Sequence, residues 1–224
     1  MKQRIKVDSG LLLLMVILTG FWYFYPQLYT GNVFWDGILS FIGMLLIFKG
    51  AFLRMAARSH KKAHSGQGVA LVITGPYAYM RNPMYLGTCL IGCGFILIAW
   101  PWWALPIFVG LFYLRFKIQI VKEETHLEEM FGDTYRSYCD RVPRIWPYMK
   151  NWLKIKIRDV MNLDEAFLIK EKWLLLLCPA AVVVLKSVKE LFVYHQTDIM
   201  QTLLIVGLAA LLEAAALIIF YSDR

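Results

Sequence analysis

Residues 84–120 read MYLGTCLIGCGFILIAWPWWALPIFVGLFYLRFKIQI, two apolar blocks separated by a short Trp-Pro-Trp-Trp turn at 100–103. Each block is close to the length of roughly 20 apolar residues with which an α-helix crosses a membrane. A turn this short permits only an antiparallel helical hairpin. Because the hairpin brings the opposite ends of its helices together, segment 81–85 must lie close to segment 117–124.

The composition agrees with a membrane protein. The sequence is 59% hydrophobic and 18% charged, whereas soluble domains average about 45–50% apolar and 25% charged. The apolar residues are concentrated in six blocks, which are 11–25, 33–53, 84–100, 102–120, 173–185 and 199–221. The first and fifth blocks are short for a span. We therefore predict an all-α, polytopic transmembrane helical bundle of five or six spans, folded as one domain over residues 1–224.

The distribution of lysine and arginine predicts how the bundle is oriented. Both are frequent in segment 2–6 and in the connections 54–81 and 122–172, and both are absent from 27–32 and 100–103. Since cytosolic loops carry the excess of basic residues, we expect both termini and the two large polar segments in the cytosol. Such a multi-pass integral membrane protein would reside in a bacterial inner membrane or in an endomembrane.

The net charge of +8 has an ordinary membrane explanation. Basic loops beside a membrane attract anionic lipid headgroups, and no basic stripe stands apart from a membrane flank. Nucleic acid is therefore not expected as a partner. Lys186 and Lys189 run against the orientation, because they follow the fifth block on the side that is expected to be poor in basic residues.

Two polar segments between the blocks carry the unusual chemistry. The first, 69–85, contains a Gly-Pro and an Asn-Pro dipeptide, which interrupt a helix. It is either a loop anchored at the headgroups or a ligand-binding loop whose backbone groups need partners. The second, 122–147, repeats large side chains at spacings of three or four, which predicts an amphipathic helix on the membrane surface. These residues are Leu127, Met130, Phe131, Tyr135 and Tyr138.

Glu123 and Glu124 are adjacent carboxylates near the end of the hairpin's second helix. Adjacent acidic residues usually form a solvated helix face. The hairpin, however, sets these two opposite Arg81, which would give a charged and partly buried pair. The spacing alone leaves both interpretations open.

Three other side chains each admit two interpretations. His60 and His64 are spaced like a metal-binding pair on a helix, but nearby glycines and the lack of a third ligand favour a polar linker over 59–68. No metal is therefore predicted. Glu213 lies within the last apolar block, where an acid is a functional candidate, although a structural pair with a neighbouring helix explains it equally well.

Small residues lie in the first helix of the hairpin. Cys89 and Cys93 share one helix face, and we interpret them as packing residues rather than as a redox or metal pair. Gly92 and Gly94 are interpreted in the same way, as small residues that permit close helix packing. The strand and the third glycine of a dinucleotide fingerprint are missing here.

Taken together, the two polar segments resemble a known family. Segments 75–77 and 81–85 match a Gly-x-Tyr loop followed by Arg-His-Pro-x-Tyr, and segments 123–127 and 131–135 match Glu-Glu-x-x-Leu followed by Phe-Gly-x-x-Tyr. A Val-Pro pair then follows at 142–143. This order resembles the isoprenylcysteine carboxyl methyltransferase and phospholipid methyltransferase family of membrane enzymes. The resemblance covers residues 69–147, about a third of the chain, and its specificity comes from both halves occurring in order around a hairpin.

The resemblance implies a pocket for S-adenosylmethionine at the cytosolic face, and it implies no metal. It assigns cofactor-binding roles to Leu71, Val72, Tyr77, Arg81, Asn82, Pro83, Tyr85, Glu123 and Glu124. It assigns no catalytic residue.

The chain departs from the family at two places. Asn82 stands where the prenylcysteine enzymes have histidine, and Gln119 and Ile120 lie where those enzymes hold the substrate carboxylate with an arginine. We therefore expect a lipidic or lipid-linked acceptor, either a carboxylate or an amine, and not specifically a prenylated cysteine.

The predicted domain has two parts with different roles. Residues 69–147 form the cofactor core, and residues 148–224 form a basic linker followed by a C-terminal helical pair. That pair would shape the lipid-side entrance or make a homodimer contact. The alternatives from other classes are a non-catalytic membrane scaffold, a small transporter, or a relative that keeps the fold without methylating.

Overall fold

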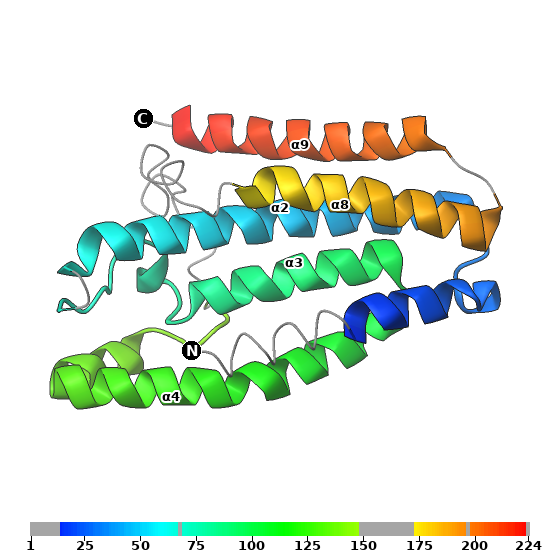
Figure 1. Cartoon of the computed structure of the whole chain (residues 1–224). Helices are drawn as coiled ribbons and strands as arrows, with labels where there is room; N and C mark the ends of the chain where they lie inside the picture. Colours follow the sequence, from blue (N-terminus) through cyan, green and yellow to red (C-terminus); the bar gives the residue numbers. More distant parts are fainter. Residues whose placement is uncertain (1–13, 67–68, 148–172, 196–197, 223–224) are drawn as a thin grey trace.

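A computed structural model describes residues 14–66, 69–147, 173–195 and 198–222. These residues form long helices that run side by side, and no strand occurs among them (Figure 1). This confirms the predicted all-α class, whereas the predicted linker at 148–172 lies outside the described residues. The elements are a first helix Leu14–Tyr23, η1 Pro26–Leu28, α2 Val33–His64, η3 Gly75–Ala78, α3 Pro83–Ala99, α4 Ala104–Arg141, α8 Leu174–Lys189, the π-helix η5 Glu190–Tyr194, and α9 Ile199–Ser222.

Two of these helices, α2 and α4, are long and apolar enough to cross a membrane. The first helix, α3 and the Ile199–Ala215 part of α9 are apolar but shorter. Large apolar side chains of α4 are exposed, with Leu111, Leu114 and Ile118 each 63% accessible. Exposed apolar surface of this extent marks a surface that contacts lipid or protein, so it agrees with a membrane protein. The number of spans stays a prediction.

Close packing of α2 against α3 forms the centre of the bundle. A Cβ added to Gly43 would lie 2.7 Å from the carbonyl oxygen of Gly94, and one added to Gly50 would lie 2.5 Å from that of Gly87. Only glycine permits backbones to approach this closely. The predicted packing role of Gly94 is therefore confirmed. In Figure 1, α3 lies between α2 and α4, and α9 lies along the other side of α2, while α8 packs against α2, α3 and α9.

The predicted polar linker at 59–68 is wrong for its first six residues, because α2 continues to His64. Lysine, arginine and alanine are good helix formers, and they extend the helix beyond its apolar part. The rings of His60 and His64 stack with centroids 4.0 Å apart, and His60 Nε2 lies 2.8 Å from the hydroxyl of Thr74. Within the described part of the chain, no three metal-ligating side chains come together.

The predicted amphipathic helix is the second half of α4, which bends at Gly132. The backbone there has φ 51° and ψ −128°, a conformation that is practically restricted to glycine. After the bend, Tyr135, Tyr138 and Val142 are buried together against Leu71 and other apolar neighbours. The helix is therefore confirmed, and its buried face packs on the polar loop before η3. Its position at the membrane surface stays a prediction.

At the opposite end of the bundle, four charged side chains are almost fully buried. Lys189 Nζ lies 2.6 Å from Asp36 Oδ1 and donates to the carbonyl of Ile98, and Lys186 Nζ lies 3.5 Å from Asp36 Oδ2 and 2.5 Å from Glu190 Oε1. We call Asp36, Lys186, Lys189 and Glu190 the sealed cluster. It explains why the two lysines ran against the orientation rule, since they neutralise carboxylates inside the protein.

Glu213 forms an ion pair with Lys49, with its Oε1 3.2 Å from the lysine Nζ. This contact joins α9 to α2. Of the two interpretations of Glu213, the structure therefore favours the structural pair.

Candidate active site

A cavity of about 780 Å³ opens where the end of α2, the loop through η3, the start of α3 and the middle of α4 meet. Ligand sites typically measure 300–1,000 Å³, so the cavity falls within the size range of a ligand site. All nine residues that the resemblance singled out line it, namely Leu71, Val72, Tyr77, Arg81, Asn82, Pro83, Tyr85, Glu123 and Glu124. The hairpin thus brings the two motifs to one place, as the short turn predicts.

The η3 loop is held by contacts from both sides. Gly75 adopts φ 58°, and a Cβ there would lie 2.7 Å from the His60 ring, so α2 supports the loop at a position suited to glycine. From the other side, the Tyr138 hydroxyl donates to the Tyr77 carbonyl at 2.7 Å. The loop is therefore clamped between α2 and the last part of α4.

Burial raises the pKa of Tyr77 well above its usual value, and the nearby charge of Glu123 raises it further. Burial likewise raises the pKa of Tyr138. Both phenols are therefore neutral at neutral pH, and they act in the site as hydrogen-bonding groups and apolar surface.

Glu124 is the central residue of a buried polar network. Its Oε1 lies 3.5 Å from Arg81 Nη1 and accepts from Asn82 Nδ2 at 3.3 Å, and its Oε2 lies 2.7 Å from Arg144 Nη2. Arg144 also donates through Nε to Oε1 at 3.2 Å, and its carbonyl accepts from Asn82 at 3.0 Å. The predicted pair between Arg81 and a glutamate is confirmed, and both oxygens of Glu124 are occupied.

Glu123 is bonded differently from its neighbour. The Tyr85 hydroxyl donates to Glu123 Oε1 at 2.7 Å, and Gln119 Nε2 donates to the same oxygen at 2.9 Å. Among the described residues, no donor reaches Oε2. The carboxylate is thus fixed in place through one oxygen while the other is available to a ligand.

Arg81 also has an unused donor. Its Nη1 contacts Glu124 and lies 2.7 Å from the Cys139 sulfur, but its buried Nε has no hydrogen-bond partner in the described structure. A buried donor without a partner is costly. Together with the second oxygen of Glu123, it gives the cavity two polar groups that a bound molecule could satisfy.

Sequence reasoning missed four basic residues of this region. Arg54, Arg58 and Lys61 of α2 line the cavity, and Arg144 holds Glu124 from outside it. Arg54, Arg58 and Lys61 are spaced by four and then by three residues. This spacing would have indicated that they share one helix face. That signal was lost because Lys61 was placed in the predicted linker at 59–68.

Comparison with known proteins places this arrangement in a family. The sequence model of the phospholipid methyltransferase family matches residues 38–134, which include segments 75–77, 81–85 and 123–127 and the hairpin between them. The chain belongs to this phospholipid and isoprenylcysteine methyltransferase family.

Curated relatives in the family carry the name protein-S-isoprenylcysteine O-methyltransferase. The one from Schizosaccharomyces pombe is 30% identical over 93 residues, covering 42% of this chain and 37% of the relative. The human one is 28% identical over 144 residues, covering 53% of this chain and 46% of the relative. The chain therefore spans less than half the length of these two enzymes.

A shorter relative is matched over nearly its whole length. An uncharacterized protein from Haemophilus influenzae is 37% identical over 67 residues, which cover 97% of it and 27% of this chain. No solved structure is significantly similar to the chain.

Proposed function

We propose that this family member is an S-adenosylmethionine-dependent methyltransferase that acts on a lipidic or lipid-linked acceptor, a carboxylate or an amine, at the cytosolic membrane face. One observation carries the proposal. Two motifs about forty residues apart line a single cavity, and a carboxylate oxygen of Glu123 and a guanidinium nitrogen of Arg81 there have no partner within the described ranges.

The residues of the cavity fit this cofactor chemically. When bound, S-adenosylmethionine supplies a methyl group whose bond to sulfur breaks as the acceptor's lone pair bonds the carbon, leaving S-adenosylhomocysteine. In the proposal, Glu123 Oε2 accepts a hydrogen bond from the amino group or the ribose. Tyr77 and Tyr85 offer aromatic faces that attract a sulfonium as they attract other cations. Leu71 and Val72 provide apolar surface for the adenine.

The protein's contribution to the reaction is alignment and shielding. The Glu124 network and the clamped η3 loop hold the cavity walls in fixed positions, which favours an in-line approach of the acceptor. The apolar walls exclude water from the reacting atoms. A carboxylate acceptor needs no base, whereas an ammonium acceptor must first lose a proton. Neither glutamate of the cavity is assigned that role, because Glu123 is proposed to hold the cofactor and both oxygens of Glu124 are occupied.

The proposal also assigns the direction of access. The cofactor enters from the cytosol, where both termini lie. The acceptor enters from the bilayer, beside the exposed apolar surface of α4. Support for this comes from the distribution of basic residues and from the length and hydropathy of α2 and α4.

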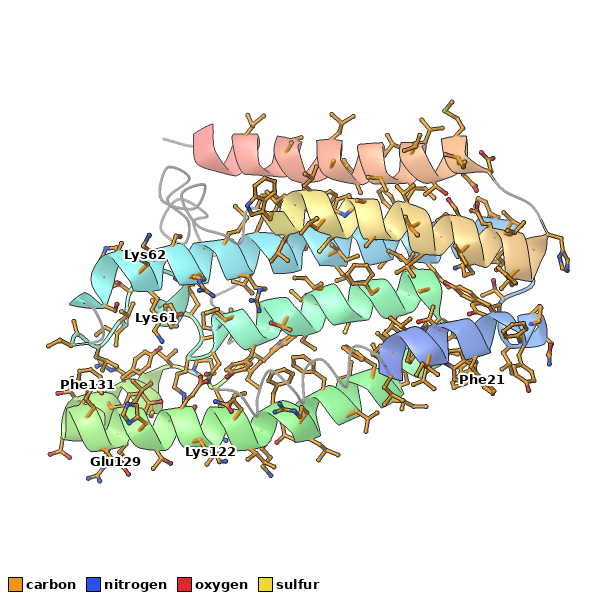
Figure 2. The ribbon with its side chains drawn as sticks, in the orientation of Figure 1. Phe21, Lys61, Lys62, Lys122, Glu129 and Phe131 are labelled. Atoms are coloured by element: carbon orange, nitrogen blue, oxygen red, sulfur yellow. The ribbon has the colours of Figure 1, made fainter. Side chains whose placement is uncertain are left out.

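The test is calorimetric binding of S-adenosylmethionine and S-adenosylhomocysteine to the detergent-purified protein. We expect Glu123→Gln to weaken binding at least tenfold, the value of one charge-assisted hydrogen bond. Glu129→Gln is the matched control, because Glu129 lies on the face of α4 that points away from α2 (Figure 2). A folded wild-type protein that binds neither ligand would contradict the proposal.

A further inference from the structure

The ion pair between Lys49 and Glu213 lies far from both ends of α2. Along this helix, Lys49 is about 20 Å from Asp36 and about 14 Å from Arg58, which lines the cavity, at 1.5 Å per residue. On α9, Glu213 is about 21 Å from Ile199, where the helix begins next to the sealed cluster. The two helices thus place the pair at the same depth. In a bilayer that α2 crosses, this depth lies within the hydrocarbon core of about 30 Å.

The ion pair is buried on one side and exposed on the other. The side chain of Glu213 is 10% exposed, but that of Lys49 is 57% exposed, whereas the lysines of the sealed cluster are almost fully buried. Two turns before Lys49, on the same face of α2, Ile42 is also exposed. The lysine therefore opens onto an apolar surface. A charged group at this depth is costly unless it has polar partners.

The Lys49 side chain is too short to reach water at either interface. Helical side chains tilt toward the N-terminus of their own helix, which for α2 is the end near Asp36. A lysine side chain extends about 6 Å, which is much less than the distance to that end. The ammonium therefore stays beside Glu213, with its Nζ 3.2 Å from the glutamate Oε1.

The hydrogen bonds that remain to be made define the chemistry of a partner. Among the residues that the structure describes, Glu213 alone bonds to the Lys49 ammonium, which has three donors and no acceptor. A partner must therefore present an acceptor, and apolar lipid tails present none. A second carboxylate would leave a net negative charge in the hydrocarbon. A side-chain amide accepts through its oxygen and donates through its nitrogen, so it can bond to both members of the pair without adding charge.

We propose that the exposed side of the Lys49–Glu213 pair is a docking site for a transmembrane helix of another protein, one that carries an asparagine or a glutamine near its centre. Amide side chains hydrogen-bond between helices within membranes, and the pair presents a donor and an acceptor to them at the matching depth. The docking site requires that α2 crosses the membrane, and it is independent of the proposed methyl transfer.

The experiment uses the full chain reconstituted into phosphatidylcholine vesicles. The probes are two single-span leucine-alanine peptides that differ at their central residue, asparagine or leucine, and that carry a terminal dansyl group. Energy transfer from the protein's tryptophans to the dansyl group measures association. We expect the asparagine peptide to associate at about fivefold lower peptide density than the leucine peptide, the effect of one interhelical hydrogen bond.

Variants of the ion pair test whether this preference arises at the proposed site. The double variant Lys49→Met with Glu213→Leu replaces the pair with apolar side chains, a change that buried ion pairs often tolerate, and it should abolish the preference. Lys49→Arg should keep it. Lys62→Gln is the matched control, because Lys62 is another exposed lysine of α2, and it should behave as the wild type does.

Three results would overturn the docking site. Equal association of the two peptides with the wild-type protein would mean that lipid, or another part of this chain, covers Lys49. A preference for asparagine that persists in the double variant would place the peptide elsewhere on the protein. Self-association of the chain without peptide, lost in the double variant, would make a second copy the occupant.

Discussion

The bundle contains two buried polar clusters, and they differ in what surrounds them. The cavity cluster, Glu124 with Arg81, Asn82 and Arg144, borders an open volume of about 780 Å³. The sealed cluster at the other end borders none of that volume, and its two lysines are at most 1% exposed. Both clusters require the desolvation of charges, which is costly unless those charges are paired.

The comparison indicates that the buried charges of the sealed cluster stabilise the fold, whereas those around the cavity are arranged to bind a ligand. In the sealed cluster, protein carboxylates pair with both lysines, which joins α8 to α2. Around the cavity, Arg81 Nε and one oxygen of Glu123 have no partner among the described residues. Unsatisfied polar groups next to an open volume indicate a ligand, whereas a fully paired cluster without volume indicates stability.

Breaking the sealed cluster should have the largest effect. Asp36→Ala removes the carboxylate shared by Lys186 and Lys189 and should cost about 3–5 kcal/mol of unfolding free energy. Denaturation of the detergent-purified protein measures it. Asp133→Ala, an exposed acid, is the control and should change little. The double variant Asp36→Asn with Lys189→Met should recover part of the lost stability. If Asp36→Ala is as stable as the wild type, the sealed cluster does not stabilise the fold.

Glu124→Gln sharpens the comparison, because Glu124 belongs to a paired network that also borders the cavity. We expect a loss of about 1–3 kcal/mol in stability together with weaker S-adenosylhomocysteine binding. Glu123→Gln should weaken binding with stability almost unchanged. Parallel denaturation and calorimetry of both variants check this difference. Equal effects of the two substitutions on stability would contradict the distinct roles of the two carboxylates.

Substitution of Arg144 should have a smaller effect than substitution of Asp36 or Glu124. Its side chain is 47% exposed, so solvent screens its interaction with Glu124, and about 1 kcal/mol of binding energy is expected to be lost in Arg144→Ala. Because Arg144 positions Glu124 and Asn82 without lining the cavity, Arg144→Lys should restore part of the affinity. If Arg144→Lys loses as much binding affinity as Arg144→Ala, the paired hydrogen bonds of the guanidinium, rather than its charge, are essential.

The hairpin and the site could be predicted because they depend on local signals. The turn at 100–103 is too short for another topology, so Arg81 had to meet the glutamates, and their ion pair follows from that geometry. The small residues on α3 likewise predicted close packing.

Other features depend on tertiary contacts that no local pattern records. Asp36 and Lys186 are 150 residues apart in the chain, and nothing near either residue indicates its partner. The extension of α2 was missed because glycines follow it and its apolar pattern ends, although the polar residues themselves favour a helix. Arg144 reaches Glu124 after α4 has bent at Gly132, and a bend of this kind is not apparent from the sequence pattern.

The distance along α2 between Asp36 of the sealed cluster and Arg58, which lines the cavity, relates the protein to the thickness of its membrane. From Asp36 to Arg58 the helix rises about 33 Å, at 1.5 Å per residue, and a bilayer has a hydrocarbon core of about 30 Å. The sealed cluster and the cavity can therefore both lie at a water interface only in a bilayer of similar thickness. In lipids with much longer or shorter chains, the membrane must deform or the helix must tilt. The acyl-chain length of the host lipid should then influence turnover through hydrophobic matching, apart from any role of that lipid as a substrate.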